Sequence, residues 1–262
     1  MQNNTFSGET ERPRLIVFDE IDSTNDYFKS DLANFKPHPE WSAIMAKKQT
    51  AGRGQRGNKW LSEEGKNLTF SFLIYPSFIS LNDQFILNAL ISLSLLEWLN
   101  TQELQASIKW PNDLYVGQRK LGGILIENRG RNQQISQSIV GIGLNINQTT
   151  FPEEIKNSCT SLSLEKKGQQ TDLQEICNEI LDRIKAKYQS FKEGKLPVDE
   201  LLETYNAHLY RRHIWADFKK ENGDIFKGYI TGVSRDGLLN MQLTSQEFAS
   251  FRLKEIQFLT VL

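Results

Sequence analysis

The run Lys109-Trp110-Pro111-Asn112-Asp113, followed by Lys120-Leu121-Gly122-Gly123-Ile124-Leu125-Ile126-Glu127, is the most discriminating stretch of this chain. Residues 107–110 predict a strand that ends at Pro111, because proline cannot donate to a strand ladder. Gly117-Gln118-Arg119 predicts a hairpin turn, and 121–127 predicts a further strand. The stretch therefore predicts a strand, a stiff turn and a hairpin in close succession.

The charged residues of this stretch suit phosphate chemistry. Lys109 can neutralise phosphate oxygens, and the carboxylate of Asp113 can hold Mg²⁺. The competing interpretation is an edge-strand turn with a solvated ion pair. Gly122 and Gly123 weaken the strand that contains them, which indicates that another group approaches the backbone there, although a β-bulge would also explain them.

A glycine-rich loop precedes this stretch, with the sequence Gln49-Thr50-Ala51-Gly52-Arg53-Gly54-Gln55-Arg56-Gly57-Asn58-Lys59-Trp60. Glycine lets a backbone approach a ligand closely, and arginine supplies planar, always-charged donors for phosphate or carboxylate. Trp60 offers a face for a flat ring. We interpret the loop as an anion cradle, with a basic, flexible surface turn as the competing interpretation.

Two further segments carry polar side chains at predicted element ends. Ser23-Thr24-Asn25 opens a predicted helix, where such residues are also preferred simply as caps. Gly141-Ile142-Gly143-Leu144-Asn145-Ile146-Asn147 ends a predicted strand, and its asparagines can pair with the edge of a purine or a urea-like group. A strand end with turn residues is the alternative for the second segment.

Hydrophobic periodicity extends the prediction outward from these motifs. The expected strands are 15–18, 42–47, 68–75, 107–110, 121–127 and 136–143, and the expected helices are 22–35, 82–100, 173–191 and 197–209. After Arg212 the chain changes to short β-type runs separated by turn signals such as Asn222-Gly223-Asp224. We therefore expect two domains, a catalytic domain over 1–210 and a small β domain over 211–262.

Composition bounds the class of protein. The 262 residues are 39% hydrophobic, with 31 Lys+Arg against 32 Asp+Glu and a formal net charge of -1. Such a balance gives no global attraction to nucleic acid or to an anionic membrane. Residues 1–14 have no apolar signal region, and no apolar run is long enough to span a membrane. Cys159 and Cys177 fit no metal or disulfide pattern, so we expect a cytoplasmic protein.

In this order, the five segments resemble the biotin protein ligases (biotin–[acetyl-CoA-carboxylase] ligases) over about residues 15 to 260. The resemblance implies an α+β fold, with a mixed central sheet and helices of the class II synthetase-like biotin/lipoate ligase type and a small C-terminal SH3-like β-barrel. It also implies an enzyme that activates biotin with ATP and Mg²⁺ as biotinyl-5′-adenylate, releasing pyrophosphate. The biotin then passes to one lysine of a biotin carboxyl carrier protein.

The resemblance also assigns roles to residues of this chain. Lys120 would bridge the biotin carboxylate and the α-phosphate, with Arg53, Lys109 and Asp113 as the other catalytic residues and Asp113 as the metal ligand. The implied biotin-binding residues are Ser23, Thr24, Asn25, Gln49, Gly52, Arg53, Lys120, Gly122 and Gly123. The implied ATP- and adenylate-binding residues are Arg53, Gln55, Arg56, Trp60, Asn112, Lys120 and Asn145.

This sequence departs from the family pattern at two places. Gln55 stands where the family usually has an arginine tied to retention of the adenylate, so we expect this chain to hold the adenylate less tightly. Phe251-Arg252-Leu253-Lys254-Glu255-Ile256 stands where the family often has a Gly-Glu-Val turn, so the resemblance does not extend to C-terminal contacts with ATP.

Three other functions compete with a biotin ligase. A lipoate or octanoyl ligase or transferase resembles this fold but lacks the combined loop and Lys-Trp-Pro-Asn-Asp signals. A non-catalytic biotin or nucleotide sensor would not need both lysines and a metal carboxylate. A nucleic-acid-binding module is disfavoured by the balanced charge. Because the first predicted strand begins near Leu15, no room remains for an N-terminal helix-turn-helix, and we expect a stand-alone ligase.

Overall fold

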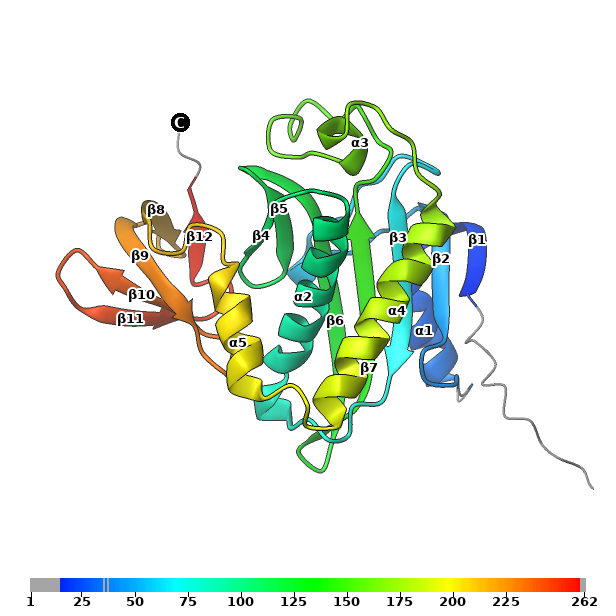
Figure 1. The fold of residues 1–262 in the computed structure, drawn as a ribbon, viewed down its shortest axis with the longest axis horizontal. Coiled ribbons are helices and arrows are strands. Elements are labelled where there is room, and N and C mark those ends of the chain that lie inside the picture. The colour runs from blue at the N-terminus through cyan, green and yellow to red at the C-terminus, as the bar shows by residue number, and fades with distance from the viewer. Residues whose placement is uncertain (1–14, 35, 37, 260–262) are drawn as a thin grey trace, which may run out of the picture.

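The computed structural model describes residues 15–34, 36 and 38–259 (Figure 1). A seven-stranded mixed sheet runs through the larger part of the molecule, in the order β1-β2-β3-β7-β6-β5-β4. Only the β1–β2 pair is parallel, and the other neighbours are antiparallel. The strands are β1 (Leu15–Ile21), β2 (Ala43–Gln49), β3 (Leu68–Ile74), β4 (Ala106–Lys109), β5 (Asp113–Val116), β6 (Arg119–Arg131) and β7 (Gln134–Leu144).

Helices cover both faces of this sheet. They are α1 (Thr24–Ala33), α2 (Phe85–Thr101), α3 (Leu162–Glu165), α4 (Leu173–Lys192) and α5 (Val198–Ala207). Figure 1 shows α2, α4 and α5 together on the face toward the viewer, with α1 behind the sheet. Because side chains alternate along a strand, Phe72 of β3 belongs to the main core, whereas Leu73 packs in a second cluster with Phe28 of α1.

Helix α2 is the centre of the main core. Its sequence is apolar around nearly its whole circumference, which is the pattern of a helix buried on all sides. Trp98 and Leu99 are fully buried, and Trp98 Nε1 donates to Glu179 of α4 at 2.9 Å. The hydrophobic periodicity of 82–100 therefore correctly identified the helix at the centre of the main core.

A five-stranded antiparallel sheet follows, in the order β11-β10-β9-β8-β12. Its strands are β8 (Trp215–Lys220), β9 (Ile225–Val233), β10 (Leu239–Leu243), β11 (Phe248–Phe251) and β12 (Ile256–Phe258). Trp110 Nε1 donates to the Gly237 carbonyl at 3.0 Å, and Arg235 pairs with both oxygens of Asp83 at 2.6 and 2.8 Å. These contacts hold the small sheet against the large one.

The predicted α+β class, with a mixed sheet and a smaller C-terminal β element, is confirmed. Strand β5, Asp113–Val116, was not predicted, because its four residues lie between a proline turn and a hairpin turn. Strands β6 and β7 both extend beyond the predicted ranges. The turn that joins them lies at Asn132 and Gln133, which both have positive φ. The register of the β5–β6 ladder shifts between Leu114 and Tyr115, so an irregularity accompanies the double glycine.

The division into two domains near residue 210 stays a prediction, as does the absence of a preceding module, since residues 1–14 lie outside the described part. In that described part, no helix combines the length and apolarity needed to cross a membrane.

Candidate active site

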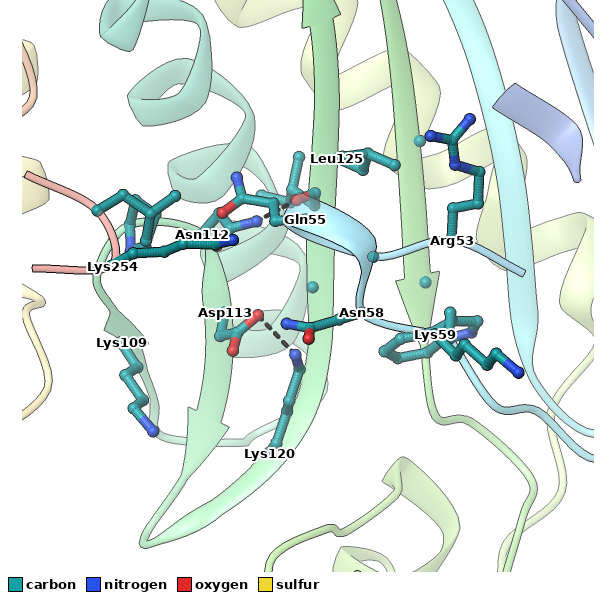
Figure 2. Close-up of a pocket in the computed structure, with 18 of the residues that line it drawn as sticks. Arg53, Gln55, Asn58, Lys59, Lys109, Asn112, Asp113, Lys120, Leu125 and Lys254 are labelled. Carbon is teal, nitrogen blue, oxygen red and sulfur yellow. Dashed lines mark hydrogen bonds and ion pairs between the residues drawn. The ribbon is translucent and has the colours of Figure 1, made fainter. Parts of the chain in front are cut away.

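A cavity of about 660 Å³ lies between the large sheet and the small one (Figure 2). It brings together most of the residues singled out from the sequence. Those that line it are Ser23, Thr24, Asn25, Gln49, Arg53, Gln55, Trp60, Lys109, Asn112, Asp113, Lys120 and Gly123. Gly52, Gly122 and Asn145 do not line it, and the side chain of Arg56 lies outside the described part of the structure.

Lys120 and Asp113 form an ion pair near the middle of the cavity, with Nζ and Oδ1 2.7 Å apart. Asp113 on β5 is the register partner of Gly123 on β6. A Cβ at Gly123 would lie 2.9 Å from Asp113 Oδ1 and 3.4 Å from Lys120 Nζ, so only glycine leaves room for the pair. Both side chains keep over a quarter of their surface exposed, which leaves them open to a ligand.

The turn between β4 and β5 is held from several sides. Asn112 is 6% exposed, and its side-chain amide donates to the Ile124 carbonyl. The Pro111 carbonyl accepts from Asn88 at 2.5 Å and from the Tyr205 hydroxyl at 2.7 Å. Because buried polar groups must be paired, these bonds fix the position of Asp113. Asn112 thus has a structural partner already.

The environment of Lys109 differs from that of Lys120, because Lys109 is more deeply buried and contacts aromatic side chains. Its Nζ donates to the Tyr115 hydroxyl at 3.0 Å and lies 5.2 Å from the centre of the Phe258 ring. Burial lowers the pKa of Lys109, because an ammonium is poorly solvated there. Figure 2 shows its side chain directed away from the Lys120–Asp113 pair. Lys109 therefore links β4, β5 and β12 at one wall of the cavity.

A buried polar network forms the opposite end. Gln49 Oε1 accepts from the backbone N–H of Thr24 at 2.8 Å and from its hydroxyl at 3.1 Å. Ser71 Oγ lies 2.7 Å from Thr24 Oγ1 and 2.6 Å from Asn25 Oδ1. Ser23 accepts from the Asp26 backbone N–H at 3.4 Å, so the capping interpretation of this segment is confirmed and its binding role stays a prediction. A compact polar ligand would find donors and acceptors here.

The glycine-rich loop folds back on itself. The backbone N–H of Trp60 donates to the Gly52 carbonyl at 3.0 Å, and that of Gly54 to the Asn58 carbonyl at 2.7 Å. A Cβ at Gly52 would lie 2.5 Å from the Trp60 carbonyl oxygen, so this glycine serves the turn of the loop. Arg53 Nη1 lies 2.5 Å from Asp26 Oδ1 and points away from Lys120 (Figure 2).

Two glycines of β7 contribute more to the cavity than the asparagines that follow them. A Cβ at Gly143 would lie 2.5 Å from the Trp60 ring, and one at Gly141 would lie 2.3 Å from Asn25 Oδ1. Asn145 is instead buried, and its amide donates to the Thr160 carbonyl at 3.0 Å. The predicted adenine contact of Asn145 stays a prediction, and its amide is already paired here.

The Trp60 indole borders this part of the cavity. Its Nε1 is buried and has no hydrogen-bond partner among the described residues. Lys120 Nζ lies 5.8 Å from the centre of the ring, so the two meet across the cavity. A buried donor without a partner is costly, and a bound ligand could satisfy it.

The sequence prediction missed further lining residues. Within the quoted loop these are Gly54, Asn58 and Lys59, and on the strands they include Thr69, Leu125, Gly141 and Gly143. The small sheet adds Lys219, Lys220, Glu221, Leu253, Lys254, Ile256, Gln257 and Phe258. Glycine alternation in 141–143 could have identified that strand face. The sequence marks 251–256 only as a departure from the family pattern, and it does not indicate that 219–221 or 256–258 meet the cavity, because they lie far along the chain from its other walls.

Asp113 is the carboxylate nearest to Lys120 that could hold a metal. The described residues contain no group of three or more His, Cys, Asp or Glu side chains placed to hold a metal ion. Mg²⁺ commonly binds through one or two carboxylates together with substrate phosphates. Asp113 therefore fits a metal that arrives with a nucleotide rather than one held by the protein alone.

Comparison with known proteins agrees with this fold. The Biotin/lipoate A/B protein ligase family matches over residues 17–145. The "Bifunctional ligase/repressor BirA" of Bacillus spizizenii is 31% identical over 231 residues, which cover 87% of this chain and 69% of that protein.

Among solved structures, the biotin protein ligase from Aquifex aeolicus in complex with biotin and ATP is 31% identical, with a TM-score of 0.75, covering 93% of this chain and 97% of that chain. The Helicobacter pylori biotin acetyl coenzyme A carboxylase synthetase shares the fold, at 24% identity and a TM-score of 0.61 over 90% of this chain and 99% of that one. The chain therefore belongs to the Biotin/lipoate A/B protein ligase family and, within it, to the biotin protein ligases.

Proposed function

We propose that this chain activates biotin with ATP and transfers it to one lysine of a biotin carboxyl carrier protein, that of acetyl-CoA carboxylase or a related carboxylase. The Lys120–Asp113 pair carries the proposal, because it places a cation and a metal-binding carboxylate 2.7 Å apart inside the cavity. The Aquifex aeolicus relative, solved with biotin and ATP, supports both substrates.

In the first step, a carboxylate oxygen of biotin forms a bond to the α-phosphorus of ATP. The bond between that phosphorus and the bridging oxygen breaks, and pyrophosphate leaves. Two anions must meet, so a preorganised cation between them lowers the barrier. We assign this role to Lys120. Mg²⁺, held with ATP by Asp113, would neutralise phosphate charge.

The polar network would bind the ureido ring of biotin. Thr24 and Gln49 offer paired donors and acceptors of the kind a urea group needs. In the second step, the neutral amine of the acceptor lysine forms an amide with the acyl carbon, the bond from that carbon to the phosphate oxygen breaks, and AMP and a proton leave. Water exclusion by the loop that ends at Trp60 would protect the adenylate from hydrolysis.

We place the reaction in the cytoplasm. Cys159 and Cys177 are free thiols, which is usual in a reducing compartment. Burial raises the pKa of Cys177 to about 12, so we assign this thiol a role in core packing and not in the reaction.

The test measures pyrophosphate release with biotin, ATP and Mg²⁺, followed by biotin transfer to a carrier domain. Lipoate in place of biotin is the parallel arm, because the family also contains lipoate enzymes. We expect release with biotin that stops when the metal is chelated. Pyrophosphate release with lipoate but not with biotin would contradict the proposed substrate. Tight biotin binding without pyrophosphate release would favour a non-catalytic sensor.

A further inference from the structure

The cavity lining is rich in cations, and three of its seven cationic side chains already have a partner. Its lining contains seven lysine or arginine side chains against two carboxylates: Arg53, Lys59, Lys109, Lys120, Lys219, Lys220 and Lys254 against Asp113 and Glu221. Lys120 pairs with Asp113, Arg53 with Asp26, and Lys109 with the Tyr115 hydroxyl. Cations beyond these are available for an anionic ligand.

Lys254 stands out among them by its place. In Figure 2 its side chain extends from the small sheet into the cavity, on the side where Gln55 and Asn112 lie. Within the described part of the chain, Lys254 forms no ion pair. The neighbouring carboxylate of Glu255 is engaged instead, since it accepts from the Arg252 backbone N–H at 2.7 Å.

The backbone at Lys254 is also unusual. The Glu255 N–H donates to the Arg252 carbonyl at 3.1 Å, which closes a four-residue turn. Lys254 occupies the third position of that turn with φ of 83°, a conformation that favours glycine. A lysine there is strained, and strain held at a ligand cavity points to function rather than to stability. The turn directs a flexible cation into the cavity at a cost in local backbone energy.

We propose that Lys254 binds the terminal phosphates of ATP and the pyrophosphate that leaves. The inference rests on the proposed function for its ligand. Lys120 occupies the middle of the cavity, Gln55 carries no charge, and Lys109 is turned toward Tyr115. Lys219 and Lys220 also line the cavity from the small sheet, but Lys254 is distinguished by its positive φ and by a side chain that extends toward Gln55 and Asn112 (Figure 2). Compact ammonium groups are suited to phosphate as point charges.

Lys254→Gly is the informative variant, because glycine removes the cation and also relieves the left-handed backbone. Titration calorimetry with Mg²⁺-pyrophosphate, and separately with AMP, should show pyrophosphate binding weakened about tenfold and AMP binding changed less than twofold, as expected for one lost charge-assisted contact. Lys254→Arg should restore most of the affinity. Lys227→Ala, an exposed lysine of β9 outside the cavity lining, controls for net charge.

The binding measurement does not depend on turnover. Equal pyrophosphate affinity in wild type and Lys254→Gly, or an equal loss in Lys227→Ala, would overturn the assignment of Lys254. A thermal unfolding temperature at or above that of wild type would show that lost folding does not explain weaker binding. If wild type releases pyrophosphate from biotin and ATP but Lys254→Gly binds normally, only this inference fails. If the Lys254 effect holds but wild type releases none, only the proposed reaction fails.

Discussion

Lys120 on β6 and Asp113 on β5 lie 2.7 Å apart across a sheet position where Gly123 leaves the space for them. The pair is partly exposed, so it contributes little to stability, since such ion pairs are worth about 0–1 kcal/mol. Its value lies in its place inside the cavity. A ligand anion that draws Lys120 away would leave Asp113 free to bind a metal that accompanies the ligand.

Lys120→Ala should keep the fold and lose biotin adenylation by about 10³-fold, the scale of removing one preorganised transition-state contact. Biotin-dependent pyrophosphate release measures the loss, and thermal unfolding checks the fold. Arg119→Ala is the matched control, because Arg119 is the adjacent residue, pairs with Glu165 and does not line the cavity. Turnover of Lys120→Ala close to wild type would refute the assigned role.

Gln55→Arg should slow the release of biotinyl-adenylate. Gln55 lines the cavity in the short turn 55–57 of the glycine-rich loop, and its amide carries no charge. An arginine would add a charged, forked donor for the adenylate phosphate, worth about 1.5–3 kcal/mol for a hydrogen bond to a charged group. The measurement is the dissociation rate of preformed adenylate from each protein. Equal rates would show that position 55 does not hold the adenylate.

Gly143→Ala should displace Trp60 and reduce both activity and stability. The new Cβ would lie 2.5 Å from the indole ring, so either the ring or β7 must shift. Overpacking of this kind costs about 1–3 kcal/mol. Denaturant unfolding and pyrophosphate release measure the two effects. The double variant Trp60→Ala, Gly143→Ala tests the cause: if Gly143→Ala costs as much stability without Trp60 as with it, the clash with Trp60 is not responsible.

The stability of the protein should depend on Lys109 at alkaline pH. Burial lowers the pKa of Lys109 in the folded state, so between that lowered value and about pH 10.5 the unfolded chain binds more protons than the folded one. The free energy of unfolding contributed by Lys109 therefore rises with pH across this window. At pH values below this window Lys109 is charged in both states, and the desolvation of its ammonium group lowers the free energy of unfolding by the full amount.

Wild type and Lys109→Met should accordingly diverge as the pH rises toward about 10.5, the ordinary pKa of lysine. The unfolding free energy of wild type, relative to the variant, should increase over that range. Burial raises the pKa of Tyr115, and this acts in the opposite direction at high pH, but Tyr115 is present in both proteins. Urea unfolding at each pH gives the comparison, and parallel pH profiles would contradict the effect.

The motifs predicted several residues that meet in the cavity, because these residues are close in the sequence. Lys120, Asp113 and Gly123 sit on one hairpin, so strand register alone places them together. The strand that contains Gly141 and Gly143 was predicted, but its contribution was assigned to the asparagines. That assignment overlooked the alternation of a strand, which turns both glycines to the cavity face, where the space above them is occupied by Asn25 and Trp60.

Side-chain direction could not be predicted in the same way. Arg53 was expected to meet the carboxylate of biotin, but it pairs with Asp26 of α1 in this structure. Lys109 was expected beside ATP, and it donates to Tyr115. Long cationic side chains take whichever partner the folded chain brings within reach, and both partners lie outside the quoted motifs.

The sequence by itself determined most of the elements, the class of fold and the motifs of the biotin ligases, because periodicity, turn residues and short-range spacing are local properties; the short strand β5 was missed. Tertiary structure alone decided which charges face one another. Lys254 and the other cavity-lining residues of 219–258 face walls that come from residues 23 to 143, because the small sheet packs against the large one through Trp110 and Arg235. Electrostatic and packing interactions depend on the distance between side chains in space, and this distance does not follow from their separation along the chain.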